Sequence, residues 1–263
     1  MTRRQGARVW LAFDLDTARW PWLRLPPQHA VVVEKYQYFS SMTAGWALGL
    51  LGPGVFTALT EVTWDCGEGR DGHSPRGYCE LETDGPRDIR FNSRFTDRSG
   101  AQAFHISGRG HVFPDGDFAA RRAARHNPPS ASIAPHDAFL RKITNEAGRW
   151  RADCLVGRVN GFHPAHRFHT GSGDHVNAAQ LYDCALQVAA QAAGHGAIRC
   201  TGGSAEFKRF TELDQPFALH AEPSTRADEW RFLVSQSGRE TARLALRLAT
   251  DESGARTAVT PPR

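Results

Sequence analysis

The sequence contains few cysteines, no CxxC pair and no long apolar run. An odd number of scattered cysteines predicts reduced thiols rather than a disulfide framework. No apolar stretch is long enough to span a membrane, and no signal peptide opens the chain. We therefore expect a cytoplasmic protein that does not enter a membrane. The five cysteines are Cys66, Cys79, Cys154, Cys184 and Cys200.

Charge is also weakly biased, because the formal net charge is only +4 over 263 residues. The basic residues are scattered apart from Arg121, Arg122 and Arg125, and no nucleic-acid motif accompanies them. This pattern argues against a nucleic-acid partner. A mild positive balance would suit a small acidic partner, although solubility is the simpler explanation. Hydrophobic residues make up 40% and charged residues 23% of the chain, which is an ordinary globular balance for one large domain or two small ones.

One long helix stands out over Asn177–Ala193, where neither Gly nor Pro interrupts an alanine-rich stretch. Asp174 or Asn177 can cap its first turn. The helix is apolar almost all round, which predicts burial. However, Asp183 and Gln187 lie four residues apart on one stripe, and a carboxylate in an apolar helix is costly unless it is paired or used. This stripe is the first place to look for chemistry.

Strand patterns precede and follow that helix. In the first half we expect a short helix at Met42–Leu51 and a hairpin turn at Asp97–Gly100. A short helix is predicted at His136–Glu146, before the second half begins. The strands expected from β-branched and aromatic runs are Val31–Phe39, Val55–Trp64, Gly77–Glu82, Ile89–Thr96, Ala101–Phe113, Arg151–Asn160, Ile198–Phe210, Phe217–Glu222, Glu229–Gln236 and Thr241–Ala249.

Each half therefore reads as one helix followed by several antiparallel strands. Such strands can wrap around the helix and bury it, which is the arrangement of the hotdog fold. We predict an α+β double hotdog with a degenerate N-terminal unit over 1–113, a linker over 114–150 and a C-terminal unit over 151–263 that carries the site.

The second half resembles hotdog dehydratases of fatty-acid and polyketide biosynthesis. The segment His169-Thr-Gly-Ser-Gly173 is similar to the start of the HxxxGxxxxP motif, with Ala178 where proline is expected. Asp183-Cys-Ala-Leu-Gln187 matches DxxxQ, and Asp183 follows His169 by fourteen positions, as in β-hydroxyacyl-acyl-carrier-protein (ACP) dehydratases. The resemblance implies the removal of water from a β-hydroxyacyl thioester. It covers roughly residues 151 to 250.

The chemistry of dehydration fits these residue types. A neutral histidine, here His169, can take the α-proton, and a carboxylic acid kept protonated by apolar surroundings, here Asp183, can protonate the leaving hydroxyl. A backbone N–H of Gly173 would stabilise the enolate oxygen, and Gln187 would orient Asp183. The resemblance implies no metal and no nucleotide cofactor, because the substrate arrives on the phosphopantetheine of an ACP or of coenzyme A.

A second resemblance leads to another reaction. His175-Val-Asn177 is similar to the HVN signature of hotdog acyl thioesterases, in which an acidic residue, here Asp183 or Asp174, would activate water. We therefore name His175, Asn177 and Tyr182 as candidate substrate-binding residues. A third alternative is a hotdog scaffold that binds an acyl carrier without catalysis. The closely spaced His163, His166 and His169 could suggest a metal site, but no partner motif follows them.

The sequence departs from tandem dehydratases in one respect. In those proteins the histidine and the acid come from different halves, whereas His169 and Asp183 both lie in the second half. The first half lacks HxxxGxxxxP, and His29 is its only histidine before the expected helix. We infer that an inert first half supports the site, or that two chains pair their second halves as a homodimer.

Overall fold

The computed structural model describes residues 3–67, 73–113, 118, 120, 122, 124, 133, 138–160, 174–194, 198–222, 224 and 226–250. Its strands form a 12-stranded antiparallel sheet in the order β1-β2-β4-β5-β6-β3-β9-β12-β11-β10-β8-β7. The strands of the first half are β1 (Arg3–Gln5), β2 (Arg8–Ala12), β3 (Phe56–Cys66), β4 (Arg76–Asp84), β5 (Asp88–Thr96) and β6 (Gln102–Phe113). Those of the second half are β7 (Leu140–Glu146), β8 (Arg149–Cys154), β9 (Ile198–Phe207), β10 (Phe217–Glu222), β11 (Glu229–Gln236) and β12 (Arg239–Thr250).

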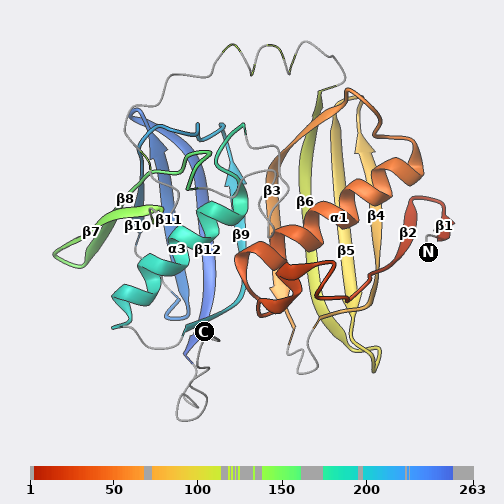
Figure 1. The fold of residues 1–263 in the computed structure, drawn as a ribbon, viewed down its shortest axis with the longest axis horizontal. Coiled ribbons are helices and arrows are strands. Elements are labelled where there is room, and N and C mark those ends of the chain that lie inside the picture. The colour runs from red at the N-terminus through yellow and green to blue at the C-terminus, as the bar shows by residue number, and fades with distance from the viewer. Residues whose placement is uncertain are drawn as a thin grey trace.

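Two long helices, α1 (Ala30–Leu48) and α3 (Ala178–Ala192), lie on the same face of this sheet (Figure 1). A short 3₁₀ helix, η1 (Pro21–Arg24), leads into α1. Each half thus repeats one pattern, in which a helix precedes four strands in sequence. The halves join where β3 pairs with β9, with Glu61 opposite Glu206 and Asp65 opposite Gly202. The arrangement brings residues from both helices toward the middle of the molecule.

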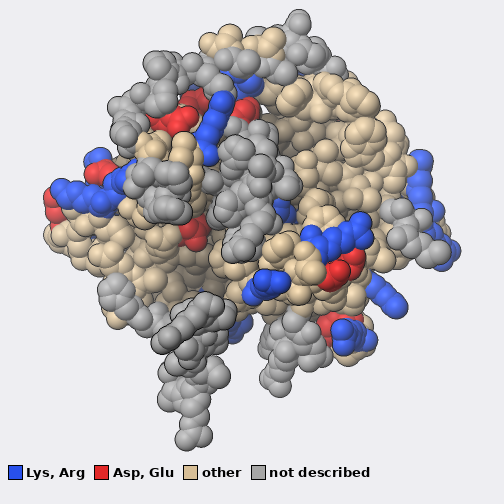
Figure 2. Space-filling view, viewed as in Figure 1, with Lys and Arg blue, Asp and Glu red and all other residues tan. Residues whose placement is uncertain are grey.

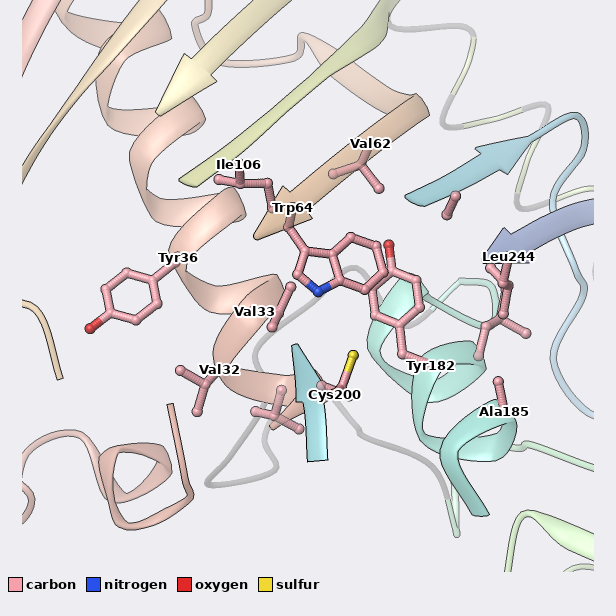
Figure 3. Close-up of a cluster of buried hydrophobic side chains, with 14 of the residues drawn as sticks. Val32, Val33, Tyr36, Val62, Trp64, Ile106, Tyr182, Ala185, Cys200 and Leu244 are labelled. Carbon is pink, nitrogen blue, oxygen red and sulfur yellow. The ribbon is translucent and has the colours of Figure 1, made fainter. Parts of the chain in front are cut away.

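Trp64 of β3 fills the core at this junction. Its side chain is 1% exposed, and its ring lies 4.7 Å from the ring of Tyr182 in α3. Val33 of α1 approaches from the other side (Figure 3). Gly203 of β9 leaves room for the indole, because a Cβ there would lie only 2.7 Å from Trp64 Cζ2. One aromatic residue therefore packs both helices and both halves together.

The prediction for the first helix was wrong. Val31–Phe39 was expected to be a strand and Met42–Leu51 a separate helix, but α1 runs without a break from Ala30 to Leu48. His29 caps its start, and Gly49 ends it in the left-handed conformation with φ 73°. The β-branched residues Val31, Val32 and Val33 are buried on this helix. Burial against the sheet outweighs their modest preference for strands.

A second error concerns His136–Glu146, which was expected to be helical. Residues Leu140–Glu146 form β7, which pairs with β8 across a tight turn. Ala147 and Gly148 have φ of 51° and 81°, and two successive positive φ values are typical of a two-residue hairpin. β8 also ends at Cys154, earlier than Asn160. The strands β3 to β6 and β9 to β12, the helix over 178–192 and the turn after β5 confirm the remaining predictions within a few residues.

Three further features agree with the composition. The five cysteines are free. No helix within the described ranges is both long enough and apolar enough to span a membrane. On the face that carries the helices, Lys and Arg lie in small groups beside Asp and Glu rather than in one basic patch (Figure 2).

Candidate active site

The start of α3 is fixed by a capping box. Asn177 Oδ1 accepts a hydrogen bond from the backbone N–H of Gln180 at 3.4 Å, and Gln180 Oε1 accepts one from the N–H of Asn177 at 2.9 Å. Of the two capping residues considered from the sequence, Asn177 is the one that caps. Its amide oxygen therefore satisfies the helix terminus.

Further along α3, Gln187 fixes the orientation of the Asp183 carboxyl. The Gln187 amide nitrogen donates to Asp183 Oδ2 at 2.7 Å, as the DxxxQ spacing predicts. Asp183 is half-buried, whereas Gln187 and Gln191 are exposed, so this stripe faces outward and α3 is not buried all round. Burial raises the pKa of Asp183 above its usual value, while the Gln187 hydrogen bond and the charge of His29 act in the opposite direction. The carboxyl is thus oriented and made more basic than an exposed one.

His29 brings the first half to this carboxyl. Its ring caps α1, where Nδ1 accepts a hydrogen bond from the backbone N–H of Val31 at 3.2 Å. Burial lowers the pKa of His29, and the charge of Asp183 opposes that shift. His29 and Asp183 therefore lie close enough for the charge of each to act on the pKa of the other. A histidine of the first half thus acts through its charge on an acid of the second half, a relation between the halves that the sequence analysis did not find.

The role of His29 was missed because the helix start was misplaced. With a strand predicted from Val31 and a helix only from Met42, His29 stood before an expected strand and not at a helix start. The signal that could have found it is local, since a residue with a side-chain acceptor before a run free of Gly and Pro is a candidate cap.

Several predicted site residues lie outside the described residues. His169 and Gly173 are among them, as are His163 and His166 of the histidine cluster. Their assigned roles stay predictions. Tyr182 is described and is only 3% exposed, because its ring packs on Trp64. Burial and the charge of Glu34 raise its pKa well above the usual value, and its assignment as a substrate contact also stays a prediction.

His175 belongs to a different place, a cavity of about 360 Å³ between the two halves. Asp174 Oδ1 lies 2.6 Å from His175 Nδ1, and the His175 ring meets Phe210 edge-on with centroids 4.8 Å apart. Apolar side chains from both halves form most of the wall, including Leu59, Phe113, Val176, Leu181, Phe207 and Phe210. A histidine that is oriented by a carboxylate beside an apolar cavity can act as a general base. It can take a proton from the nucleophile that attacks an acyl group bound in the cavity.

Arg122 fixes that carboxylate from behind. Its side chain is 6% exposed and donates to Asp174 Oδ2 at 3.2 Å and to both oxygens of Glu212 at 2.7 and 2.8 Å. The guanidinium also lies 4.2 Å from the centroid of the Phe210 ring. The sequence analysis treated this arginine as part of a basic linker stretch. In the structure, Arg122 lies between the two halves in sequence and donates hydrogen bonds to Asp174 and Glu212 of the second half.

No group of three or more His, Cys, Asp or Glu side chains in the described part of the chain is arranged to hold a metal ion. Among the residues that the sequence named as candidates, the structure joins Asp183 to Gln187 on α3 and Asp174 to His175 in the cavity. Asp183 and His175 thus belong to different constellations, although the thioesterase interpretation grouped them.

Comparison with known proteins identifies the fold. The sequence matches no family model and no curated protein sequence. The structure is similar to a 12:0-ACP thioesterase from Umbellularia californica, with a TM-score of 0.60, 11% identity, and coverage of 94% of this chain and 99% of that one. It is also similar to an acyl-ACP thioesterase from Bacteroides thetaiotaomicron, with a TM-score of 0.58, 8% identity, and coverage of 92% and 97%. The chain has a hotdog fold.

A mutant of the CurK dehydratase is similar as well, with a TM-score of 0.50, 13% identity and 98% of both chains covered. The hotdog neighbours thus include thioesterases and a dehydratase, the two kinds of protein that the sequence resembles. At these identities the likeness establishes the fold alone. The choice of reaction depends on the side chains.

Proposed function

We propose that this hotdog protein is an acyl-thioester enzyme that dehydrates a β-hydroxyacyl group carried on an acyl carrier protein. The observation that carries the proposal is the half-buried Asp183 carboxyl, which Gln187 orients at 2.7 Å and on whose pKa the charge of His29 from the other half acts. Elimination of water needs a group that moves a proton and a polar partner beside it. A half-buried carboxyl with a raised pKa suits the proton transfer.

The proposal also treats the chain as a double hotdog, with a first unit over 1–113 and a second unit that includes β7 and β8. The repeated order of helix and strands supports this division, as does the pairing of β3 with β9 where the halves meet. With His29 beside Asp183, the site draws a histidine and an acid from different units. It then needs no second copy of the chain.

The substrate would bring its own phosphopantetheine arm from an ACP or from coenzyme A, so the reaction needs no metal or nucleotide. The test is mass spectrometry of 3-hydroxyacyl-ACP species of varied chain length after incubation with the protein. We expect at least one substrate to lose a molecule of water. Release of free acid from every substrate would reject dehydration in favour of hydrolysis. No change in any substrate would favour the non-catalytic scaffold.

Hydrolysis is the second candidate, and the cavity beside His175 favours it. Asp174 accepts from His175 Nδ1–H at 2.6 Å, which leaves Nε2 with a lone pair to take a proton from water. This version differs from the one proposed from the sequence, because Asn177 caps α3 and Asp183 pairs with Gln187. The acidic residue that orients His175 would be Asp174 alone.

One substitution separates the two candidates. We expect His175→Ala to reduce any thioester hydrolysis by about a hundredfold, since general base contributions are typically 10²–10⁴-fold. Dehydration should change little, because His175 belongs to the cavity rather than to the Asp183 constellation. Rates of free-acid release and of water loss, measured on the same ACP substrate, give both results. A large loss of dehydration in the folded variant would contradict the assignment of the two sites.

A further inference from the structure

A second histidine lines the cavity that contains His175. This residue is His111 of β6, so histidines from both halves of the chain form part of one cavity wall. His111 is tied to Asp88 of β5, whose Oδ1 lies 2.8 Å from His111 Nδ1. At about 360 Å³ the cavity is at the lower end of the usual size of ligand pockets, so one bound acyl group can contact both rings.

The carboxylate decides which nitrogen of His111 is left for another partner. An ionised carboxylate only accepts hydrogen bonds, so Nδ1 is the donor to Asp88 and Nε2 is the remaining nitrogen. When the ring binds a proton at Nε2 as well, it presents an N–H there, and an ordinary imidazole takes up that proton near neutral pH. The side chain is 31% exposed, so the proton can come from water. The protonated ring is therefore a cationic donor on the wall of a largely apolar cavity.

The two histidine–aspartate pairs differ in the charge around the carboxylate. Asp174, which orients His175, also accepts a hydrogen bond from the Arg122 guanidinium at 3.2 Å. Among the described residues, only His111 pairs with the side chain of Asp88. The negative charge of Asp174 is thus shared with an arginine, whereas that of Asp88 can balance a positive charge on its histidine. This difference suits His175 to act as the neutral base and His111 to act as the charged donor.

Two backbone donors beside His175 are already used. The N–H of Val176 donates to the carbonyl oxygen of Thr211 at 2.8 Å. The N–H of Asn177 donates to the Gln180 side chain at 2.9 Å. Neither group is therefore available to bind the oxygen of a substrate carbonyl. Negative charge that develops on that oxygen needs a preorganised donor, and a cationic side chain is a strong one.

We propose that His111 stabilises the oxyanion when a thioester is hydrolysed in this cavity, where His175 acts as the base. The inference rests on hydrolysis, the second candidate function. It gives the first half a direct part in the reaction, because β6 supplies the oxyanion donor and the residue before Val176 supplies the base.

The steps of this hydrolysis balance without any further reactant. Water adds its oxygen to the carbonyl carbon while His175 Nε2 takes one of the water protons. The C=O electron pair moves onto oxygen, which accepts a hydrogen bond from His111 Nε2–H. The carbonyl then re-forms, the C–S bond breaks with its electron pair on sulfur, and His175 passes its proton to that sulfur. A free acid and a thiol leave, and both rings return to their starting states.

Two ketones test this role without any turnover. Octyl trifluoromethyl ketone readily adds water at its carbonyl and resembles the tetrahedral oxyanion, whereas octyl methyl ketone resembles the uncharged substrate. We expect calorimetric titration to show that the parent protein binds the fluorinated ketone about a hundredfold more tightly, because transition-state analogues bind 10²–10⁸-fold more tightly than substrates. In His111→Phe most of this preference should be lost, while the affinity for octyl methyl ketone stays close to that of the parent.

Further variants make the titration specific. His105→Phe changes a histidine of the same strand that bonds to Asn92 and does not line the cavity, so it should keep the preference. Asp88→Asn removes the charge that balances His111 without changing the cavity wall, so it should lose part of the preference even if His111→Phe does not fold. A folded His111→Phe protein that keeps the full preference would overturn the inference. The same holds if Arg209→Met, which removes another cation from the wall, abolishes the preference instead.

Hydrolysis of decanoyl-pantetheine separates failure of this inference from failure of the reaction on which it rests. Loss of one oxyanion donor typically slows a reaction by 10²–10³-fold, so we expect kcat of His111→Phe to fall about a hundredfold with KM little changed. If the parent and a folded His111→Phe protein hydrolyse this thioester equally fast, only the role of His111 is rejected. If the parent binds neither ketone and hydrolyses no thioester, the cavity is rejected as a hydrolytic site, and the role of His111 with it.

Discussion

Replacing Asp183 with asparagine should slow water loss from a β-hydroxyacyl-ACP by about 10²–10⁴-fold. An amide of the same shape can still accept the hydrogen bond that Gln187 donates to Asp183 at 2.7 Å, but it cannot take or deliver a proton. Asp153→Asn is the matched control, because Asp153 is a carboxylate of β8 that pairs with Arg151 away from the site. The measurement is the initial rate of dehydrated product by mass spectrometry for parent, variant and control.

The same variant has a predictable effect on stability. Burial raises the pKa of Asp183 above its ordinary value of 3.8, so the folded protein binds this proton more tightly than the unfolded chain. The ionised carboxylate therefore destabilises the fold increasingly as pH rises through the folded pKa, and the effect is absent at low pH. We expect Asp183→Asn to melt at or above the parent temperature, with a gap that opens as the pH rises above the ordinary aspartate pKa of 3.8 and levels off above the raised pKa of the folded protein. A slow variant that melts far below the parent would have lost its fold rather than its chemistry.

The parts of the fold that the sequence predicted share a physical cause. Strands β10 and β11 were predicted to the residue and α3 nearly so, because their periodicities are clean and turns or caps mark their ends. The first helix failed because Val31, Val32 and Val33 favour strands locally, while their packing against the sheet requires a helix. β7 was missed because its turn uses Ala147 in a positive-φ conformation that few sequences signal.

The candidate site was predictable where its spacing lies within one helix. Asp183 and Gln187 are four residues apart on α3, so helical geometry alone brings them together. The influence of His29 on Asp183 links residues more than a hundred positions apart, and no local pattern encodes it. It follows from the two helix starts meeting beside the β3–β9 junction. The cavity beside His175 is likewise built from strands of both halves.

Arg122 illustrates the same limit, because the sequence gives no sign that this arginine is buried. Its guanidinium lies between the Asp174 and Glu212 carboxylates, two groups that would otherwise face each other with like charge. A single residue of the linker thus compensates two acidic residues of the second half. Removing one partner from such a buried cluster leaves uncompensated charge, which is strongly destabilising.

Arg122→Met should therefore lower the free energy of unfolding by about 3–5 kcal/mol. For a chain of this size that corresponds to a fall of roughly 10 °C in the melting temperature. Adding Glu212→Gln to the variant should restore part of the loss, since one of the two carboxylates that lost the arginine is then gone. Arg226→Met is the matched control, because Arg226 pairs with Asp228 on an exposed loop and its loss should leave the melting temperature unchanged.

The activities of the folded Arg122→Met protein should diverge. Asp174 loses the bond that fixes its second oxygen, so His175 loses its orientation and any hydrolysis in the cavity should fall. Dehydration at Asp183 should persist below the melting temperature, because Gln187 holds that carboxyl from within α3. If Arg122→Met melts no lower than Arg226→Met, the linker does not dock through this arginine. The cavity would then lack the support that makes its histidine a base.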